Sequence, residues 1–192
     1  MYNVIAITRE FGSLGRQIAK FVAEKMNYDY YDRDIIDKIA EDFDVGIKEL
    51  TTNESKFGKG IYGKMMYPLG TGGYEKQERL YDSERKVIEY LAMRKNCVIV
   101  GRCADYILQD KADCLKVFIH ADMQFRAERI VKVYGEREQS PEERLKDKDK
   151  RRAAYHRFYT DMKWGHAQNY HICLNSGVLG IDKCVDILTQ LF

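Results

Sequence analysis

Short apolar runs alternate with helical patterns along the chain. The first run, residues 4–7, leads into a turn, and Ile18, Val22 and Met26 then recur at helical spacing. This alternation predicts an α/β fold of three layers, in which helices cover both faces of a parallel sheet of about five strands. The other expected strands cover residues 28–31, 97–100, 115–119 and 170–175.

The helical segments carry recognisable start signals. Asp32 and Asp34 place acids at the start of a helix that runs to Ala40, and Ser140-Pro141-Glu142-Glu143 has the pattern of a capping box with proline at the first helical position. No linker composition divides the 192 residues, so we expect one domain over 1–192. The remaining helices are expected at 17–26, 45–53, 75–95, 123–134 and 180–192.

Residues 55–74 differ in character from the rest of the chain. They are rich in glycine and interleaved with tyrosine, phenylalanine and methionine. A segment this loose inside a compact domain is usually functional or disordered. Its aromatic side chains suit stacking on a base, and they equally suit the surface of a homo-oligomer.

Composition narrows the class of protein. The 32 basic residues nearly balance the 30 acidic ones, for a formal charge of +2, which gives no overall signature of a nucleic-acid polymer as partner. No apolar stretch approaches the length that crosses a membrane, and the start of the chain lacks the features of a signal peptide. The five cysteines contain no C-x-x-C pair, and the four histidines have no ligand-like spacing. We therefore expect reduced thiols, no structural zinc and a cytoplasmic protein.

The turn after the first strand has the spacing of a phosphate loop. In the pattern G-x-x-x-x-G-K-[ST], Gly15 is the second glycine and Arg16 stands where lysine belongs. Glu10 replaces the first glycine, and Gln17 replaces the hydroxyl residue. Glycines followed by a helix start can cradle a phosphate with backbone N–H groups. The alternative is a plain strand–turn–helix corner that needs Gly12 and Gly15 for backbone geometry alone.

Charged residues follow two other expected strands. In a doubly wound sheet such positions point into the ligand crevice, which makes Asp32, Arg33 and Arg102 site candidates. An arginine can bind phosphate bidentately, so Arg102 is a candidate phosphate ligand and Asp105 a weaker candidate for acceptor recognition. The alternatives are helix capping by Asp32 and a salt bridge of Arg102. The charged run at 148–152 is, by composition alone, a solvated helix face.

Several short sequence blocks stand along the chain in the order in which a known protein family carries them. They are Thr8-Arg9-Glu10-Phe11-Gly12-Ser13, Gly15-Arg16, Tyr31-Asp32, Val98-Ile99-Val100-Gly101-Arg102 and Lys163-Trp164-Gly165. Together they resemble the cytidylate kinase-like family, P-loop proteins related to the nucleoside monophosphate kinases. The resemblance spans nearly the whole chain and is weakest at about 44–78. A phosphate loop with arginine in place of lysine is its most specific feature.

The resemblance implies a P-loop kinase fold, with a flap-like insert at about 45–78 that binds the acceptor and a lid-like helical region at about 122–163. It implies phosphoryl transfer from ATP, with Mg²⁺, to a small acceptor such as the nucleoside monophosphate CMP. The implied cofactor-binding residues are Gly12, Ser13, Leu14, Gly15, Arg16 and Gln17. The implied catalytic residues are Arg16, Arg129, Arg151 and Arg152, and the substrate residues are Asp32, Arg33, Arg102, Asp105 and Asp149.

Three departures from the family pattern bear on catalysis. The Arg16 guanidinium is a planar group with several donors, whereas the lysine ammonium that it replaces is a point charge. Gln17 offers no hydroxyl to Mg²⁺, and the strand at 98–100 ends without an acidic residue. The metal ligands stay open, with Glu10 and Asp32 as candidates. A nucleotide- or anion-binding sensor without turnover is therefore the second hypothesis. A structural domain that binds partners through residues 55–74 is the third.

Overall fold

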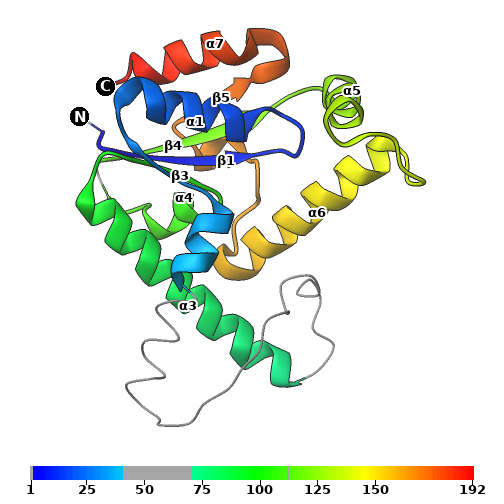
Figure 1. Ribbon diagram of the computed structural model, residues 1–192. Helices are drawn as coiled ribbons and strands as arrows, with labels where there is room; N and C mark the ends of the chain where they lie inside the picture. The colour runs from blue at the N-terminus through cyan, green and yellow to red at the C-terminus, as the bar shows by residue number, and fades with distance from the viewer. Residues whose placement is uncertain (1, 41–70, 112) are drawn as a thin grey trace.

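The structure is a computed structural model that describes residues 2–40, 71–111 and 113–192. Its core is a sheet of five parallel strands in the order β2-β3-β1-β4-β5 (Figure 1). The elements are β1 (Val4–Arg9), α1 (Gly15–Met26), β2 (Asp29–Tyr31), α3 (Thr71–Arg94), β3 (Cys97–Val100), α4 (Ala104–Ile107), β4 (Cys114–His120), α5 (Met123–Tyr134), α6 (Pro141–Thr160), η1 (Ala167–Asn169), β5 (Ile172–Asn175) and α7 (Ser176–Thr189). Residues 33–40 are also helical.

Strand β1 lies at the centre of the sheet. It pairs with β3 on one side, with Val4 opposite Cys97, and with β4 on the other, with Arg9 opposite Ile119. The apolar residues of β1 and β3 are buried, as expected for central parallel strands covered on both faces. The carboxyl ends of β1, β3 and β4 therefore meet at one edge of the sheet.

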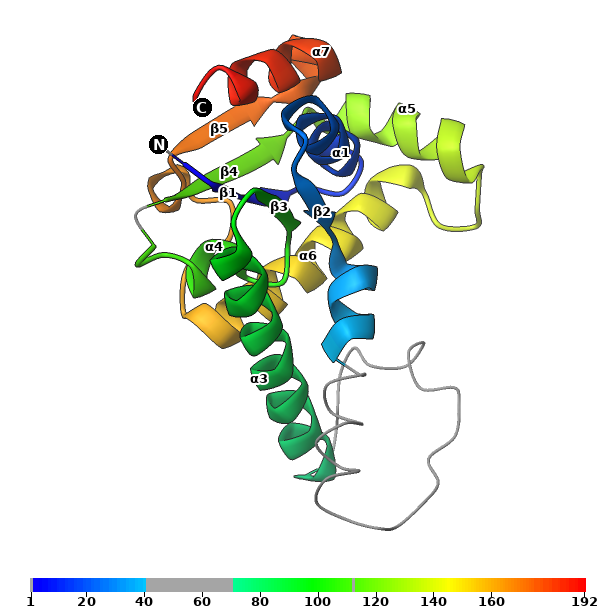
Figure 2. The same ribbon diagram turned by 60° about the vertical axis from the view of Figure 1, so that its left-hand side comes forward.

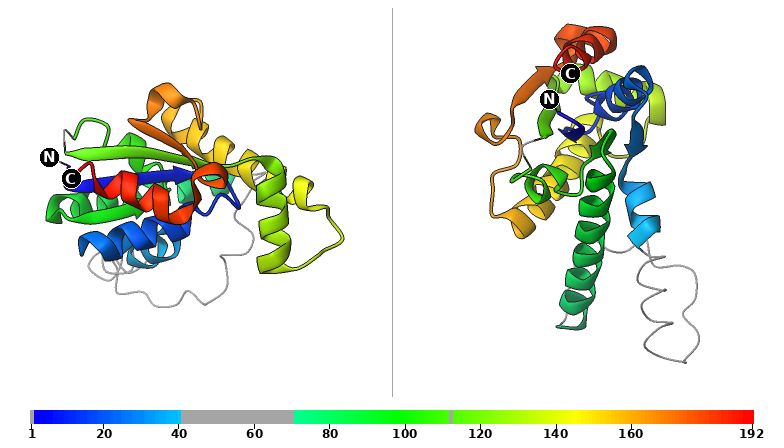
Figure 3. Two further views of the ribbon diagram at one scale, coloured as in Figure 1. Left: turned by 90° about the horizontal axis from the view of Figure 1, so that it is seen from above. Right: turned by 90° about the vertical axis from the view of Figure 1, so that its left-hand side faces the viewer.

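Helices cover both faces of this sheet, which confirms the three-layer α/β fold. Ile5 and Ile7 point to the face covered by α1 and α7, where Ile18 and Leu188 complete one core. Val4 and Ala6 point to the opposite face, and their core includes residues of α3, α4 and the helix at 33–40. Figures 2 and 3 show the two helical layers on either side of the strands.

Helix α5 and the first half of α6 lie at the carboxyl edge of the strands, and α6 then runs toward α3 and α4 (Figure 1). They share a small core of Ala127, Ile130 and Leu145, and Phe11 of the turn after β1 packs against it. The capping box at Ser140 forms as predicted, with Pro141 at the first turn of α6. The lid-like region predicted at 122–163 contains these two helices, and we refer to them below as the lid-like helices.

Several boundaries differ from the expectations. The long helix begins at Thr71 rather than 75, and the last strand begins at Ile172 rather than 170. Element α7 starts with a short helical segment at Ser176, which the Asn175 side chain caps by accepting from the N–H groups of Gly177 and Val178. Gly180, with a φ of 73°, is non-helical and separates this segment from the helix that follows, so the helix expected from 180 onward is present. The helix expected at 45–53 and most of the segment at 55–74 lie outside the described residues.

All five cysteines are free thiols, and four of them are buried. Burial raises the pKa of Cys97 and of Cys114 to about 12, so these thiols stay protonated near neutral pH. In the part of the chain that the structure describes, no helix is both long and apolar enough to cross a membrane.

Candidate active site

The turn between β1 and α1 has the backbone geometry of a phosphate cradle. Gly12 has a φ of +83°, and Leu14, the residue before α1, has a φ of 62°. Both values lie in the left-handed region, which turns the chain sharply enough to enter the helix at Gly15. The start of α1 then offers unpaired N–H groups and positive potential, which together suit an anion.

Hydrogen bonds join this turn to the end of β4. The Ser13 hydroxyl lies 2.9 Å from the Glu10 carbonyl oxygen and 3.1 Å from that of Ile119. The Glu10 carboxylate accepts from the Ala121 N–H at 3.1 Å, and the Ser176 hydroxyl donates to the Ser13 carbonyl at 2.6 Å. Ser13 and Ser176 are fully buried. These hydrogen bonds therefore hold the loop against β4 and the start of α7.

The lid-like helices hold the same turn from the other side. Asp149 of α6 accepts from the Phe11 N–H at 2.7 Å and from Arg126 of α5 at 2.5 Å. Arg126 also donates to the Phe11 carbonyl at 3.3 Å and lies 3.5 Å from the Glu10 carboxylate. Asp149, expected to contact the acceptor, thus links the loop to both helices. Arg126 is buried and was not among the expected site residues.

Arg16, the basic residue of the loop, turns toward the end of β2. Its guanidinium donates to the buried carboxylate of Asp32 and, at 2.7 Å, to the exposed carboxylate of Asp34. The Tyr30 hydroxyl adds a hydrogen bond to Asp32 at 3.0 Å. Burial alone would raise the pKa of Asp32, but the hydrogen bonds from Arg16 and Tyr30 outweigh it and lower that pKa.

The other loop residue and the expected lid arginines have separate partners. Gln17 accepts a hydrogen bond from Arg129 at 2.6 Å, so α5 reaches the start of α1. Arg152 donates to the carbonyl oxygen of Arg9 at 2.9 Å. Arg151 pairs with Asp147 one turn earlier on α6, at 2.7 Å. The structure thus brings Arg129 and Arg152 to the phosphate loop, whereas the ion pair of Arg151 lies within its own helix.

On the opposite flank of the site, Arg102 is enclosed by acids. Its guanidinium hydrogen-bonds Asp37 and lies 3.2 Å from the Glu84 carboxylate of α3. Arg33 pairs with the same Asp37 at 3.3 Å. Tyr155 of α6 donates to Glu84 at 2.9 Å. The salt bridge that the sequence left as the alternative for Arg102 is therefore present.

Glu84 was missed by sequence reasoning, although a signal was available. It occupies a position on the apolar stripe of α3, four residues before Ile88, and it is buried. Burial raises its pKa, and nearby Arg102 counters that effect. A carboxylate on the buried stripe of a helix requires a cationic partner, and that requirement predicts a buried arginine.

Asp105 serves a different contact. It is buried in α4, where its carboxylate is hydrogen-bonded to Nε2 of the buried His156 of α6 at 2.9 Å. The Thr160 hydroxyl lies 3.1 Å from the other ring nitrogen of His156. In this structure Asp105, expected to recognise the acceptor, anchors the second half of α6 to α4.

The comparisons with known proteins place the chain in a family. The model of the cytidylate kinase-like family matches residues 4–178. The chain belongs to this family. The match covers the phosphate loop, the lid-like helices and the strand ends just described.

Solved structures agree on the fold of this cytidylate kinase-like protein. An uncharacterised protein from Eubacterium ventriosum is 28% identical, with a TM-score of 0.75 over 98% of this chain and 96% of that one. Shikimate kinase from Acinetobacter baumannii is 15% identical, with a TM-score of 0.54 over 100% and 93%. A gluconokinase from Sinorhizobium meliloti is 12% identical, with a TM-score of 0.55 over 98% and 93%. No match was found among the curated proteins. The fold is that of the P-loop kinases.

One more basic residue of this family member stands at the site and was not singled out from the sequence. Arg9 ends β1, and its guanidinium lies against Gly101, where a Cβ would stand 2.3 Å from Nη1. Burial, together with the charge of Arg152, lowers the pKa of Arg9 to about 9. The signal in the sequence was a charged residue at the end of an otherwise apolar central strand.

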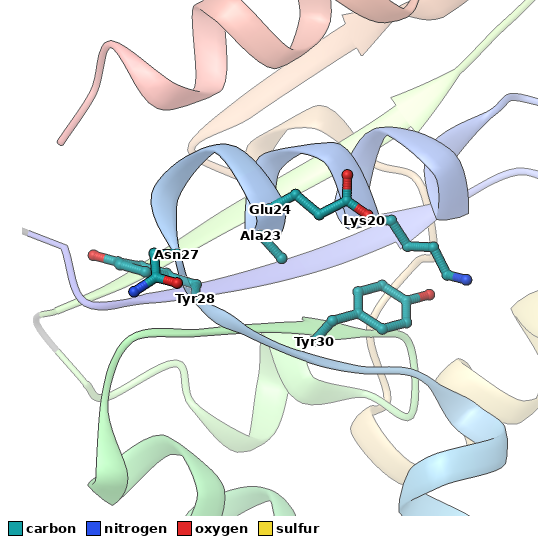
Figure 4. Close-up of a pocket in the computed structure, with 6 residues that line it drawn as sticks. All are labelled: Lys20, Ala23, Glu24, Asn27, Tyr28 and Tyr30. Atoms are coloured by element: carbon teal, nitrogen blue, oxygen red, sulfur yellow. The ribbon is translucent and has the colours of Figure 1, made fainter.

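A groove of about 250 Å³ lies between α1 and β2 (Figure 4). Figure 4 shows Lys20 and Tyr30 at one end of it and Asn27 and Tyr28 at the other. Lys20 lies 5.6 Å from the centre of the Tyr30 ring. None of the residues that line the groove belongs to the phosphate loop, so we place the candidate site at the strand ends instead.

Proposed function

We propose that this protein transfers a phosphoryl group from ATP to a small acceptor, and that the acceptor is a nucleoside monophosphate such as CMP. The observation that carries this proposal is the meeting of the phosphate loop with Arg16, Arg129 and Arg152 at one edge of the sheet. Phosphoryl transfer needs positioning and charge neutralisation more than covalent chemistry, and backbone amides and arginines supply both.

Each group has a proposed part in the reaction. The turn from Gly12 to Gly15 cradles the phosphates of ATP with its N–H groups, and Arg16 contacts the β- and γ-phosphates. Arg129 and Arg152 reach the loop from the lid-like helices, where they stabilise charge on the phosphoryl group in transfer. Arg33 and Arg102 lie on the acceptor flank, although Asp37 holds both of them in this structure.

The residues present fit Mg²⁺ bound together with ATP. Mg²⁺ takes oxygen ligands and is usually held by one or two carboxylates plus substrate phosphates. Asp32 and Asp34 place two carboxylates beside Arg16, and no larger cluster of metal-ligating side chains occurs among the described residues. Asp32 and Asp34 would hold the ion once Arg16 turns from them to the β- and γ-phosphates, and the charge of the ion would offset that of these phosphates.

The test is ADP release from ATP and Mg²⁺ across a panel of monophosphates and hydroxyl acceptors. We expect turnover that depends on the acceptor and falls at least about a hundredfold in Arg16→Ala, because a positioned cation at the transferring phosphate carries several kcal/mol. Lys20→Ala, on the groove outside the proposed site, is the matched control and should retain activity.

A nucleotide sensor without turnover is the second candidate. It is favoured by the partners of two loop residues, since Arg16 is turned to Asp32 and Asp34 and the Gln17 carboxamide is engaged by Arg129. Tight binding of ATP with no product from any acceptor would replace the kinase proposal with this one. No binding of ATP would leave the turn at Gly12 to Gly15 as a structural corner.

A further inference from the structure

Two glycines, Gly15 and Gly101, leave room for the Arg9 side chain at the carboxyl edge of the sheet. A Cβ at Gly101 would stand 2.3 Å from its Nη1, and a Cβ at Gly15 would stand 2.6 Å from its Cβ. The side chain thus runs from the start of α1 to the residue that follows β3. Both glycines leave the space that this arginine occupies, so the placement of its guanidinium is built into the backbone.

Arg9 differs from the other arginines of the site in its partners. Each of the others contacts or approaches a carboxylate, apart from Arg129, which donates to the Gln17 carboxamide. No hydrogen bond or ion pair joins the Arg9 guanidinium to another residue in the part of the chain that the structure describes. A partly buried guanidinium without a direct ion-pair partner is costly, and binding an anion removes that cost.

The Arg9 guanidinium lies to one side of the phosphate cradle. The loop is bonded to β4 through Glu10 and Ser13, whereas the Arg9 guanidinium lies at Gly101 on the β3 side of β1. That side carries Asp32 and Arg33 after β2, because β2 pairs with β3. An anion on Arg9 would therefore lie beside the cradle, in the half of the crevice away from β4.

We propose that Arg9 binds the anionic group of the acceptor, and that the acceptor of this protein is an anion. This proposal rests on the proposed kinase function and adds a residue to it. A guanidinium suits both a phosphate monoester and a carboxylate, since both accept bidentate hydrogen bonds. Arg33 and Arg102 would have to break their ion pairs with Asp37 to bind the same group, whereas Arg9 has no ion pair to break.

The test compares anionic and neutral probes of the same shape. The full-length protein is first saturated with Mg²⁺ and a non-hydrolysable ATP analogue, so that the cradle is filled. Calorimetry then measures binding of CMP against cytidine, and of glycerate against glycerol, which separates a phosphate monoester from a carboxylate. The variants are Arg9→Met, and Arg85→Met as the control, because Arg85 forms an exposed ion pair with Glu89 on α3.

We expect the anionic member of one pair to bind wild type more tightly than the neutral member. Arg9→Met should weaken that anion about ten- to a hundredfold and leave the ATP analogue unaffected, as for loss of one charged hydrogen-bonding partner. The unfolding temperature of Arg9→Met should equal or exceed that of wild type, because the lost charge had no partner. A purely structural arginine would lower that temperature instead.

Gly101→Ala provides a second variant. Its Cβ would displace the Arg9 guanidinium, so anion binding should fall as in Arg9→Met although Arg9 is still present. Gly135→Ala has a similar φ of +74° and nothing within 4 Å of the added Cβ, and it should leave anion binding unchanged. Both glycine variants should lose stability through backbone strain, so the comparison of their anion binding isolates the displacement of Arg9.

Three results would overturn the role of Arg9. One is equal affinity of wild type and Arg9→Met for the anion, and another is a loss confined to the ATP analogue. The third is binding of neither probe pair together with no effect of inorganic phosphate on the unfolding temperature of the loaded protein. Failure of the wild type to bind the ATP analogue is a different result, because it contradicts the proposed kinase function itself.

Discussion

At the level of single residues, Asp32 organises the flank of the loop. Its Oδ2 atom accepts hydrogen bonds from the side chains of Arg16 and Tyr30, and its Oδ1 atom accepts from the N–H groups of Asp34 and Ile35. One side chain therefore caps the helix at 33–40 and holds the basic residue of the phosphate loop. Capping and a place in the site were alternatives for Asp32 in the sequence, and in the structure the same carboxylate caps the helix and pairs with Arg16.

Replacing Asp32 by asparagine tests how much the ion pair between Arg16 and Asp32 contributes to the free energy of unfolding. Asparagine caps helices as well as aspartate does, so the loss should come from the charged hydrogen bonds and amount to about 1.5 to 3 kcal/mol in urea unfolding. Asp34→Asn is the matched control, because an exposed ion pair contributes below about 1 kcal/mol. Equal losses in the two variants would contradict this account.

The same variant has a pH signature. The pKa of Asp32 is lowered in the folded protein, so its stabilisation is present above the ordinary value of 3.8 and is lost as pH falls through the lower folded value. Stability of Asp32→Asn should therefore depend less on pH below about 4 than stability of the wild type. Unfolding midpoints measured from pH 6 down to 3 would show the two curves converging.

The site shows which residues a sequence can nominate. Asp32 and Arg102 follow strands, and the rule that strand ends point into the crevice placed both at the correct edge. Arg9 and Glu84 were missed although each is a charged residue in an otherwise apolar element, because the pattern does not show which side chains such a residue meets across the fold. The pairing of Arg102 with Asp37 and Glu84 likewise depends on three segments that meet in space.

At the level of elements, periodicity predicted the type of each described strand and of the longer helices better than their ends, and it missed the short helices α4 and η1. Helix α5 was predicted with its observed bounds because Asp122 and Gly135 flank a clear pattern. The short segment that begins at Ser176 was missed because its Asn175 cap lies in the run that was assigned to the last strand. Gly180, predicted as the start of the last helix, is the non-helical residue that stands directly before the main part of α7.

The capping box of α6 gives an element-scale prediction. The Ser140 hydroxyl accepts from the Glu143 N–H at 3.3 Å, and the Glu143 carboxylate accepts from the Ser140 N–H at 3.2 Å. Ser140→Ala should lower the free energy of unfolding by about 1 kcal/mol. Ser83→Ala is the control, because that hydroxyl bonds back to the Arg79 carbonyl within α3 and alanine favours helix there. A larger loss at Ser83 than at Ser140 would refute the capping account.

At the level of the whole molecule, the cores differ greatly in size. The two cores on the faces of the sheet join most of the strands and helices, whereas α5 and the first half of α6 share three buried apolar residues. The second half of α6 is anchored by His156 on Asp105 and by Tyr155 on Glu84. The lid-like region therefore has a firmly held end and a weakly held one.

Amide hydrogen exchange should reveal this gradient. Regions with few buried contacts open at lower free energy than the core, so amides of α5 and of residues 141–150 should exchange before those of β1 and β4 and before those of the second half of α6.

Mg²⁺ with a non-hydrolysable ATP analogue should slow exchange in α5 and 141–150, because Asp149 and Arg126 tie both to the loop that would bind the phosphates. The control is α7 from Ile181 onward, which packs against α1 and should respond little. Exchange at 141–150 that matches β1 without nucleotide, or a nucleotide effect equal in α7, would show that these helices are not a separately labile unit.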